Sequence, residues 1–229
     1  MMKKPDVKVV LLGDMNVGKT SLLHRYMERR FADTVSTVGG AFYLKQWGPY
    51  NISIWDTAGR EQFHGLGSLY CRSASAIIFT YDVCHRQSLV ELEDRFLGLT
   101  DTASDDCIYA VVGNKIDLTD EHEEGGEFGG EAVRKGSASK LRKQVSTEDA
   151  IALYKKIIKY KMVEESHAPA ADKMCFETSA KTGHNVDFLF DSVFNMVIPL
   201  IVKKKSSGPD DTVNLTQNHH EKKTKSGCC

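Results

Sequence analysis

The sequence carries almost no net charge and no long apolar run. Its 229 residues include 30 lysines and arginines against 31 aspartates and glutamates, so no overall field attracts nucleic acid. The longest late apolar stretch, residues 196–202, is interrupted by Pro199 and is far shorter than the about 20 residues that cross a bilayer. Residues 1–6 lack the apolar segment of a signal peptide. We therefore expect a cytosolic chain that spans no membrane and binds no nucleic acid.

The cysteines lack the spacing of a metal site or of a disulfide framework. Cys71, Cys84, Cys107 and Cys175 are scattered through apolar segments, which favours reduced, buried thiols. The remaining two, Cys228 and Cys229, are adjacent at the end of the sequence. The length suits one domain with extensions rather than two full domains.

Short β-branched runs alternate with amphipathic stretches, which is typical of an α/β fold. We expect six strands, at residues 7–12, 41–47, 51–55, 75–81, 108–113 and 174–178. Gly48-Pro49 predicts a hairpin turn, so the second and third strands are antiparallel at one edge of a mostly parallel sheet. About five helices accompany the sheet. One begins at the capping box Ser146-Thr147-Glu148-Asp149, and another presents apolar residues at spacings of three and four over 186–201.

Two segments do not fit the pattern of the domain, which we place at residues 1–203. Residues 119–145 are poor in apolar side chains, with acidic residues first and basic residues after. We expect a disordered insertion there, and a tolerated surface loop is as good an interpretation as a partner-binding role. Residues 204–229 are expected to form a flexible tail.

A phosphate-binding loop follows the first predicted strand. Residues 13–20 read Gly-Asp-Met-Asn-Val-Gly-Lys-Thr and open a helix, which is the context that a P-loop requires. Gly13 and Gly18 allow the backbone N–H groups to turn toward phosphates. Lys19 then neutralises the β- and γ-phosphates, and the Thr20 hydroxyl is a ligand for Mg²⁺.

Two later motifs indicate that the base is guanine. In Asn114-Lys115-Ile116-Asp117, a carboxylate at Asp117 can accept from both the ring N–H and the exocyclic amine of guanine, a donor pair that adenine lacks. Glu177-Thr178-Ser179-Ala180-Lys181 follows the last strand, where a backbone N–H can meet the guanine oxygen. An ATP-using P-loop enzyme remains the alternative, and Asp117 argues against it.

A third motif, Trp55-Asp56-Thr57-Ala58-Gly59, ends a predicted strand beside the P-loop. Asp56 can orient Mg²⁺-bound water there, and the Gly59 N–H can meet the γ-phosphate. With these motifs in order, the chain resembles the Rab branch of Ras-like small GTPases, which implies a P-loop GTPase fold and the cofactors GTP or GDP and Mg²⁺. The nucleotide-binding residues are then Gly13, Asp14, Met15, Asn16, Val17, Gly18, Lys19, Thr20, Ser21, Phe31, Thr37, Asp56, Gly59, Asn114, Lys115, Asp117, Ser179, Ala180 and Lys181.

The resemblance also assigns roles that the motifs alone do not. It implies that Phe31 stacks on the base, that Thr37 in switch I joins Thr20 and Asp56 at Mg²⁺, and that residues 59–70 form switch II. Phe42, Trp55 and Tyr70 match the aromatic triad through which Rab proteins meet effectors. Hydrophobic packing is the other interpretation of the triad, and for Trp55 it is equally good.

The resemblance implies that Lys19, Gly59 and residue 60 take part in catalysis. Arg60 departs from the family at the last of these positions. Most members have glutamine there, whose amide both donates to and accepts from the attacking water, whereas a guanidinium only donates. Met15 adds a side chain where Ras has glycine. We therefore expect slow intrinsic GTP hydrolysis, although an activating protein that brings its own glutamine and arginine can still assist.

The resemblance finally implies two geranylgeranyl groups on Cys228 and Cys229, which lack the three residues that follow a singly prenylated cysteine. Two lipid chains anchor stably, whereas one binds marginally. We expect a monomeric GTP/GDP switch in vesicle traffic, on the cytoplasmic face of an intracellular membrane. Its expected partners are an exchange factor, a GTPase-activating protein, a prenyl-binding chaperone and effectors. The alternative is a constitutively GTP-loaded scaffold.

Overall fold

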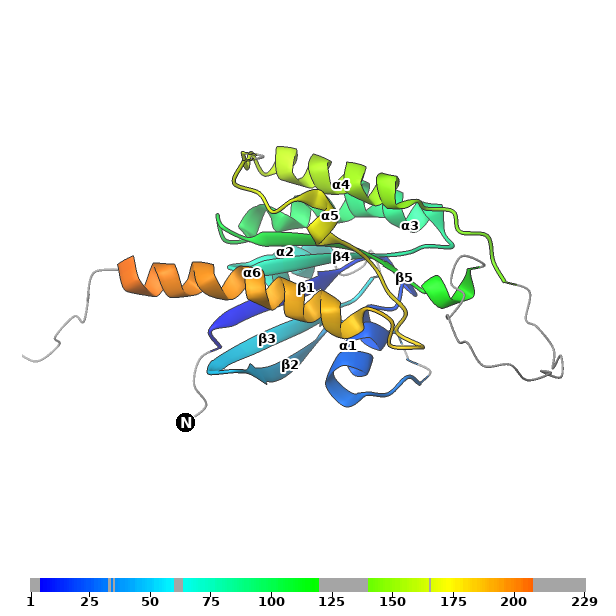
Figure 1. Cartoon of the computed structure of the whole chain (residues 1–229), viewed down its shortest axis with the longest axis horizontal. Coiled ribbons are helices and arrows are strands. Elements are labelled where there is room, and N and C mark those ends of the chain that lie inside the picture. Colours follow the sequence, from blue (N-terminus) through cyan, green and yellow to red (C-terminus); the bar gives the residue numbers. More distant parts are fainter. Residues whose placement is uncertain are drawn as a thin grey trace, which may run out of the picture.

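A six-stranded sheet organises the chain, in the order β2-β3-β1-β4-β5-β6 (Figure 1). The computed structural model describes residues 5–32, 34, 36–59, 64–119, 140–164 and 166–207. The strands are β1 (Val7–Leu12), β2 (Gly40–Trp47), β3 (Tyr50–Thr57), β4 (Ala76–Asp82), β5 (Ile108–Asn114) and β6 (Cys175–Glu177). Only the β2–β3 pair is antiparallel within this sheet; the other neighbours are parallel. The predicted hairpin, edge strand and strand positions are confirmed.

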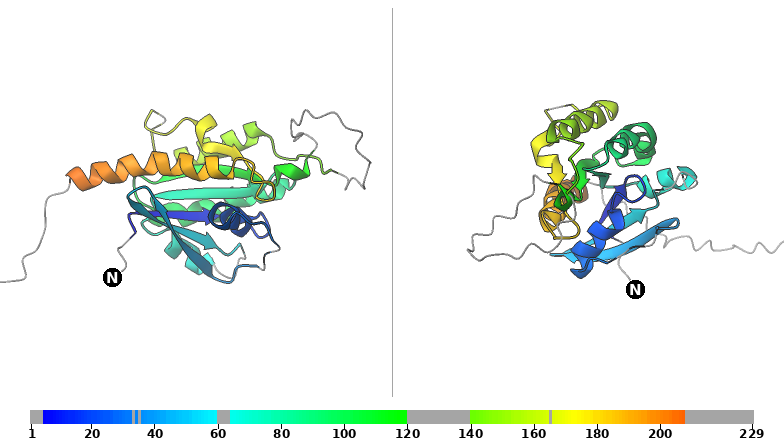
Figure 2. Two further views of the ribbon diagram at one scale, coloured as in Figure 1. Left: turned by 60° about the horizontal axis from the view of Figure 1, so that its bottom comes forward. Right: turned by 90° about the vertical axis from the view of Figure 1, so that its right-hand side faces the viewer.

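Helices cover both faces of the sheet. Helices α1 (Lys19–Glu28) and α6 (Val186–Ser207) pack together on one face, and α2 (His64–Cys71), α3 (Arg86–Glu91) and α4 (Thr147–Tyr160) lie on the other (Figure 2). The short α5 (Ala171–Met174) precedes β6. Parallel strands covered on both faces must be apolar throughout, and β4 and β5 are buried along almost their whole length.

Helix α6 packs through the stripe that its sequence predicts. Val186, Leu189, Phe190, Val193, Phe194 and Val197 are buried. Tyr26 of α1 stacks on Phe190, with ring centroids 4.2 Å apart. Pro199 lies inside the helix without ending it. No described helix is both long and apolar enough to cross a membrane.

A π-turn and a 3₁₀ helix continue directly from α3, at Leu92–Phe96 and Leu97–Thr102. The sequence alone does not place these elements. Apolar residues have helical spacing there, at Leu89, Leu92, Phe96 and Leu99, but that spacing does not separate a π-turn or a 3₁₀ helix from an α-helix. Single π-helical turns are rare and are frequently found at functional sites. Arg95 of this turn contacts Asp14 of the P-loop, as described below.

The cysteines agree with the prediction of free thiols. Cys71 and Cys107 are buried, Cys84 and Cys175 are partly buried, and all four are unpaired as disulfides. Burial raises the pKa of each thiol, to about 12 for Cys71, Cys107 and Cys175.

Two expected boundaries move. Thr119 is buried, the Leu141 N–H donates to the Leu118 carbonyl at 2.8 Å, and Val145 lies in the core, so both ends of the expected insertion at 119–145 belong to the packed domain. Helix α6 continues past residue 203 to Ser207, and Lys204 pairs with Asp106 at 2.6 Å. The rest of the expected insertion, residues 120–139, and of the tail, residues 208–229, lies outside the described residues.

Candidate functional site

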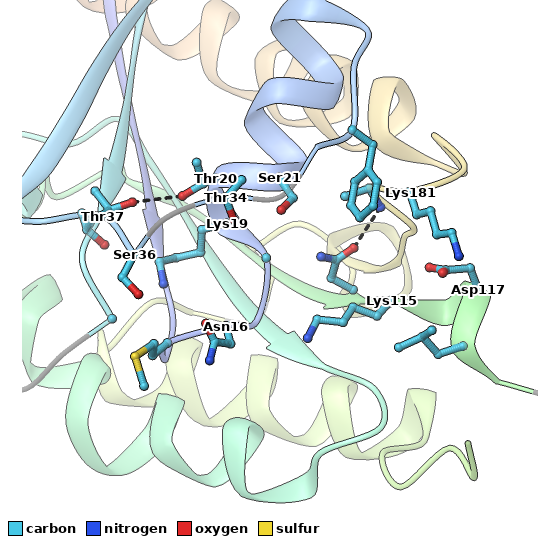
Figure 3. Close-up of a pocket in the computed structure, with 18 residues that line it drawn as sticks. Asn16, Lys19, Thr20, Ser21, Thr34, Ser36, Thr37, Lys115, Asp117 and Lys181 are labelled. Atoms are coloured by element: carbon cyan, nitrogen blue, oxygen red, sulfur yellow. Dashed lines mark hydrogen bonds between the residues drawn. The ribbon is translucent and has the colours of Figure 1, made fainter. Parts of the chain in front are cut away.

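A cavity of about 380 Å³ opens where the loops after β1, β3, β5 and β6 meet (Figure 3). Ligands of open α/β sheets bind at this edge, beyond the carboxyl ends of the strands. Thr37 lies toward one end of the cavity and Lys115 and Asp117 lie toward the other. Its lining consists of Met15, Asn16, Gly18, Lys19, Thr20, Ser21, Phe31, Thr34, Ser36, Thr37, Thr57, Gly59, Asn114, Lys115, Asp117, Leu118, Ala180 and Lys181.

The P-loop conformation depends on glycine at two positions. Gly18 has φ of 96°, and a Cβ there would lie 2.4 Å from the side-chain nitrogen of Asn114. Gly13 has φ of 150°, and a Cβ there would lie 2.2 Å from the Thr80 carbonyl oxygen. Both positions therefore exclude a side chain through backbone geometry and through space. Helix α1 starts at Lys19, so its free N–H groups and positive end face the cavity.

Lys19 is buried at the floor of this loop. Its Nζ donates to the carbonyls of Gly13 and Asp14 at 2.7 and 2.8 Å. Burial lowers the pKa of Lys19 to about 8, against the opposing charges of Asp56 and Asp14. A polyphosphate would stabilise the ammonium form, because it brings negative charge to a buried cation.

Three oxygen-bearing side chains converge beside Lys19. The Thr20 and Thr37 hydroxyls lie 3.0 Å apart, and they donate to Asp56 Oδ2 at 2.6 and 3.1 Å. Burial raises the pKa of Asp56, while the two hydroxyls and Lys19 oppose the rise. Asp56 Oδ1 is buried and has no hydrogen-bond partner among the described residues. Mg²⁺ prefers oxygen ligands of this kind, so these residues fit the ion that the P-loop implies.

Asp117 is held in place at the opposite end of the cavity. The Ser179 hydroxyl donates to Asp117 Oδ1 at 2.6 Å, which leaves the other carboxylate oxygen and further lone pairs for a purine edge. Lys115 adopts φ of 71°, and its Nζ pairs with Asp82 Oδ2 at 2.7 Å. Its stem thus lies along the cavity while its charge is anchored at the end of β4.

Asn114 ties the two ends of the site together. Its Nδ2 donates to the Val17 carbonyl at 3.0 Å, and its Oδ1 accepts from the Ala180 N–H at 3.1 Å. Because Asn114 is buried, losing it would leave unpaired backbone groups in both loops. It therefore joins the P-loop to the loop after β6.

Gly59 touches the P-loop directly. A Cβ on it would lie 2.3 Å from the Met15 nitrogen and 2.5 Å from the Asp14 carbonyl carbon. Only glycine permits this approach of one backbone to another. The start of the expected switch II therefore rests on the peptide between Asp14 and Met15.

Most predicted nucleotide-binding residues line this cavity. Gly13, Val17, Asp56 and Ser179 support the lining residues through the contacts above, and Asp14 is outside the lining. Arg60, Cys228 and Cys229 lie outside the described residues. Phe42, Trp55 and Tyr70 form a contiguous row, with ring centroids 5.1 and 5.7 Å apart.

Sequence reasoning missed two arginines at the rim. Arg25 of α1 donates from Nε to the Ala180 carbonyl at 2.8 Å and from Nη2 to the Lys181 carbonyl. Arg95 contacts Asp14 and Gly59. Neither arginine belongs to a local motif, because its partners are far away in the sequence. Thr34, Ser36 and Leu118 also line the cavity without having been singled out.

The fold and this cavity define a P-loop nucleotide-binding protein of the Ras-like class. The sequence profile of the Ras family matches residues 8–198. The chain is 66% identical to human "Ras-related protein Rab-20" over 233 aligned residues and 67% identical to its mouse counterpart over 232, with full coverage of both chains in each case. It is 32% identical to Arabidopsis thaliana "Ras-related protein RABC2a", covering 97% of this chain and 93% of that one. The chain belongs to the Rab family of small GTPases, which bind guanine nucleotides.

Proposed function

We propose that this Rab GTPase is a GTP/GDP switch of membrane traffic that recruits effectors in its GTP state. The observation that carries the proposal is the convergence of Thr37 with Thr20 and Asp56, at 3.0 and 3.1 Å. Thr37 belongs to the loop between α1 and β2, whereas the other two are fixed by α1 and β3. A γ-phosphate with Mg²⁺ would bind all three, and its loss would release Thr37 and the loop around it.

The proposed output surface adjoins the switch segments. Phe42 of β2 is 48% exposed. Its ring contacts Trp55, which in turn contacts Tyr70 of α2. A Cβ on Gly40 would lie 2.8 Å from the Tyr70 ring, so a residue close to switch I is in direct contact with the last residue of switch II. We therefore assign effector binding to this aromatic row, because a movement of either switch would change its shape.

Hydrolysis is proposed to be slow and to act as a timer. Arg60, at the position where most relatives have glutamine, has no acceptor with which to orient the attacking water. The Met15 side chain lies on the cavity wall and is 40% exposed, so it competes for space with water near the γ-phosphate. The second candidate function, a GTP-loaded scaffold with negligible turnover, rests on the same two residues.

Membrane attachment is proposed through prenyl groups on Cys228 and Cys229. The Rab family assignment supports this, as does Lys222-Lys223-Thr224-Lys225 just before the two cysteines, since basic residues add attraction to anionic lipid. The expected regulators are an exchange factor, an activating protein and a prenyl-binding chaperone.

Single-turnover GTP hydrolysis by the full chain tests the timer. We expect Arg60→Gln to accelerate hydrolysis by at least about tenfold, since water-orienting and charge-stabilising groups are worth far more in related enzymes. Equal and fast turnover by both proteins would contradict slow hydrolysis. No turnover by the natural chain, even with a Rab-activating protein, would favour the scaffold. Displacement of bound GDP by ATP as well as by GTP would contradict the guanine switch itself.

A further inference from the structure

Arg95 reaches the phosphate end of the site from outside the nucleotide motifs. It lies in the π-turn after α3, with its side chain 19% exposed. Its Nη1 contacts Glu91 Oε2 at 2.9 Å and Asp14 Oδ1 at 3.3 Å, and its Nη2 contacts the Gly59 carbonyl at 3.4 Å. One guanidinium thus touches both the P-loop and the first residue of switch II.

The two groups that Arg95 joins already touch each other. Gly59 rests on the peptide between Asp14 and Met15, too closely for a Cβ. Met15 and Gly59 line the cavity at this junction, whereas Asp14 does not and instead directs its carboxylate to Arg95. The arginine therefore bridges the outer side of this contact, and the inner side lines the cavity where a γ-phosphate would bind.

The charges at this junction bear on how a triphosphate would differ from a diphosphate. The Asp14 carboxylate is a negative group in the loop that must hold phosphate, and a γ-phosphate adds negative charge at the same end. Arg95 lies between the carboxylates of Glu91 and Asp14, at 2.9 and 3.3 Å, and offsets part of their charge. These contacts are partly shielded from water, where such interactions are stronger than at an exposed surface. A planar guanidinium can bind carboxylate and carbonyl together, which an ammonium does with less geometric control.

The π-turn explains how Arg95 attains this position. An extra residue in one turn shifts the following side chains around the helix axis, and such turns are frequent at functional sites. Here the turn spans Leu92–Phe96 and buries both end residues, while the Arg95 guanidinium lies on its rim, 5.3 Å from the centroid of the Phe96 ring.

We propose that Arg95 is a positioning residue that couples the P-loop to the start of switch II and raises the preference for GTP over GDP. It holds the Gly59 carbonyl, and with it the direction in which switch II leaves β3, and it neutralises Asp14 when the γ-phosphate is bound. The inference rests on the proposed GTP/GDP switch and adds a residue that none of the nucleotide motifs contains.

The test is competitive binding of GDP and of the non-hydrolysable analogue GppNHp to the full chain with Mg²⁺. We expect Arg95→Ala to weaken GppNHp relative to GDP by about five- to tenfold, at the lower end of typical coupling between sites. The ratio for Arg95→Lys should lie between those of the natural chain and of Arg95→Ala, because lysine keeps the charge without the planar guanidinium. Adding Asp14→Asn to Arg95→Ala should restore much of the ratio, since the uncompensated carboxylate of the P-loop is then gone, and only that of Glu91, in α3, is left.

Arg86→Ala is the matched control, because Arg86 is an arginine of the preceding α3 that pairs with Asp149 at 2.9 Å, away from the cavity. It should leave the ratio unchanged. An unchanged ratio of GppNHp to GDP binding in Arg95→Ala would overturn the inference, whether or not both nucleotides bind more weakly. A lowered ratio that Asp14→Asn does not restore would overturn the role given to the Asp14 charge. If Arg95→Ala does not fold, the ratio for Arg95→Lys decides. A natural chain that retains neither guanine nucleotide would instead overturn the proposed switch.

Discussion

The Nε of Arg25 donates to the carbonyl of Ala180 at 2.8 Å, across a sequence separation of 155 residues. The same guanidinium reaches the Lys181 carbonyl. Helix α1, whose N-terminus faces the cavity, thereby holds the loop whose backbone is expected to meet the guanine oxygen. The two ends of the nucleotide site are thus coupled at α1 as well as at Asn114.

Arg25→Ala is expected to weaken GDP and GppNHp binding equally, by about tenfold. Removing a charged hydrogen-bond donor from the partly buried Ala180 carbonyl costs about 1.5 kcal/mol or more. The loop that Arg25 holds is proposed to contact the base, which both nucleotides share. Arg29→Ala is the control, since Arg29 pairs with Asp187 at an exposed position of the same helix end, where ion pairs contribute little. Nucleotide competition measures both. A loss confined to GppNHp would contradict this role.

Much of the site was predictable because its residues form short, contiguous motifs. The P-loop needs its glycines and lysine in consecutive positions, and all six strands appear as local β-branched runs. Arg25 and Arg95 gave no such signal, since their function depends on loops that only the fold brings near. The packing of Thr119 and of residues 140–145 was missed for the same reason. Their contacts, including the Thr119–Leu141 bridge, join positions on either side of a polar segment.

Asp117→Asn should exchange guanine preference for xanthine preference. The asparagine amide presents one donor and one acceptor, which suits a base whose exocyclic amine is replaced by oxygen, whereas the carboxylate of Asp117 only accepts. Loss of two charge-assisted hydrogen bonds should weaken GDP by at least about a hundredfold. Competition of GDP with xanthosine diphosphate measures the exchange, and Asp105→Asn, outside the cavity lining, is the control. Unchanged GDP binding would contradict the base assignment.

The N-terminal cap of α4 should make the free energy of unfolding depend on pH. Asp149 accepts from Arg86 and from the Ser146 N–H, and the Ser146 hydroxyl accepts from the Asp149 N–H. Hydrogen bonding by Arg86 is the largest cause that lowers the pKa of Asp149 to about 2. Since the folded pKa lies below the ordinary value of 3.8, the stabilisation is present above that value and is lost as pH falls toward 2.

Asp149→Ala is therefore expected to lower the free energy of unfolding by about 1 kcal/mol at pH 7. The difference from the natural chain should shrink as pH is lowered from 4 toward 2. Urea unfolding of the GDP-bound protein across this range measures it, and Asp172→Ala, an acidic residue of α5, is the control. A difference that stays constant with pH would show that the carboxylate charge is not the source of the stabilisation.

Gly59→Ala should impair the GTP state more than the GDP state. A Cβ would lie 2.3 Å from the Met15 nitrogen, so either the P-loop or switch II must move, and the Gly59 N–H leaves the place where a γ-phosphate can accept from it. Such overpacking costs about 1–3 kcal/mol, and we expect the preference for GppNHp over GDP to fall by about tenfold. Gly98→Ala is the control, because a Cβ there would meet no atom within 4 Å outside its own turn of helix. If Gly59→Ala keeps both the natural nucleotide preference and the natural thermal stability, this backbone contact is not required.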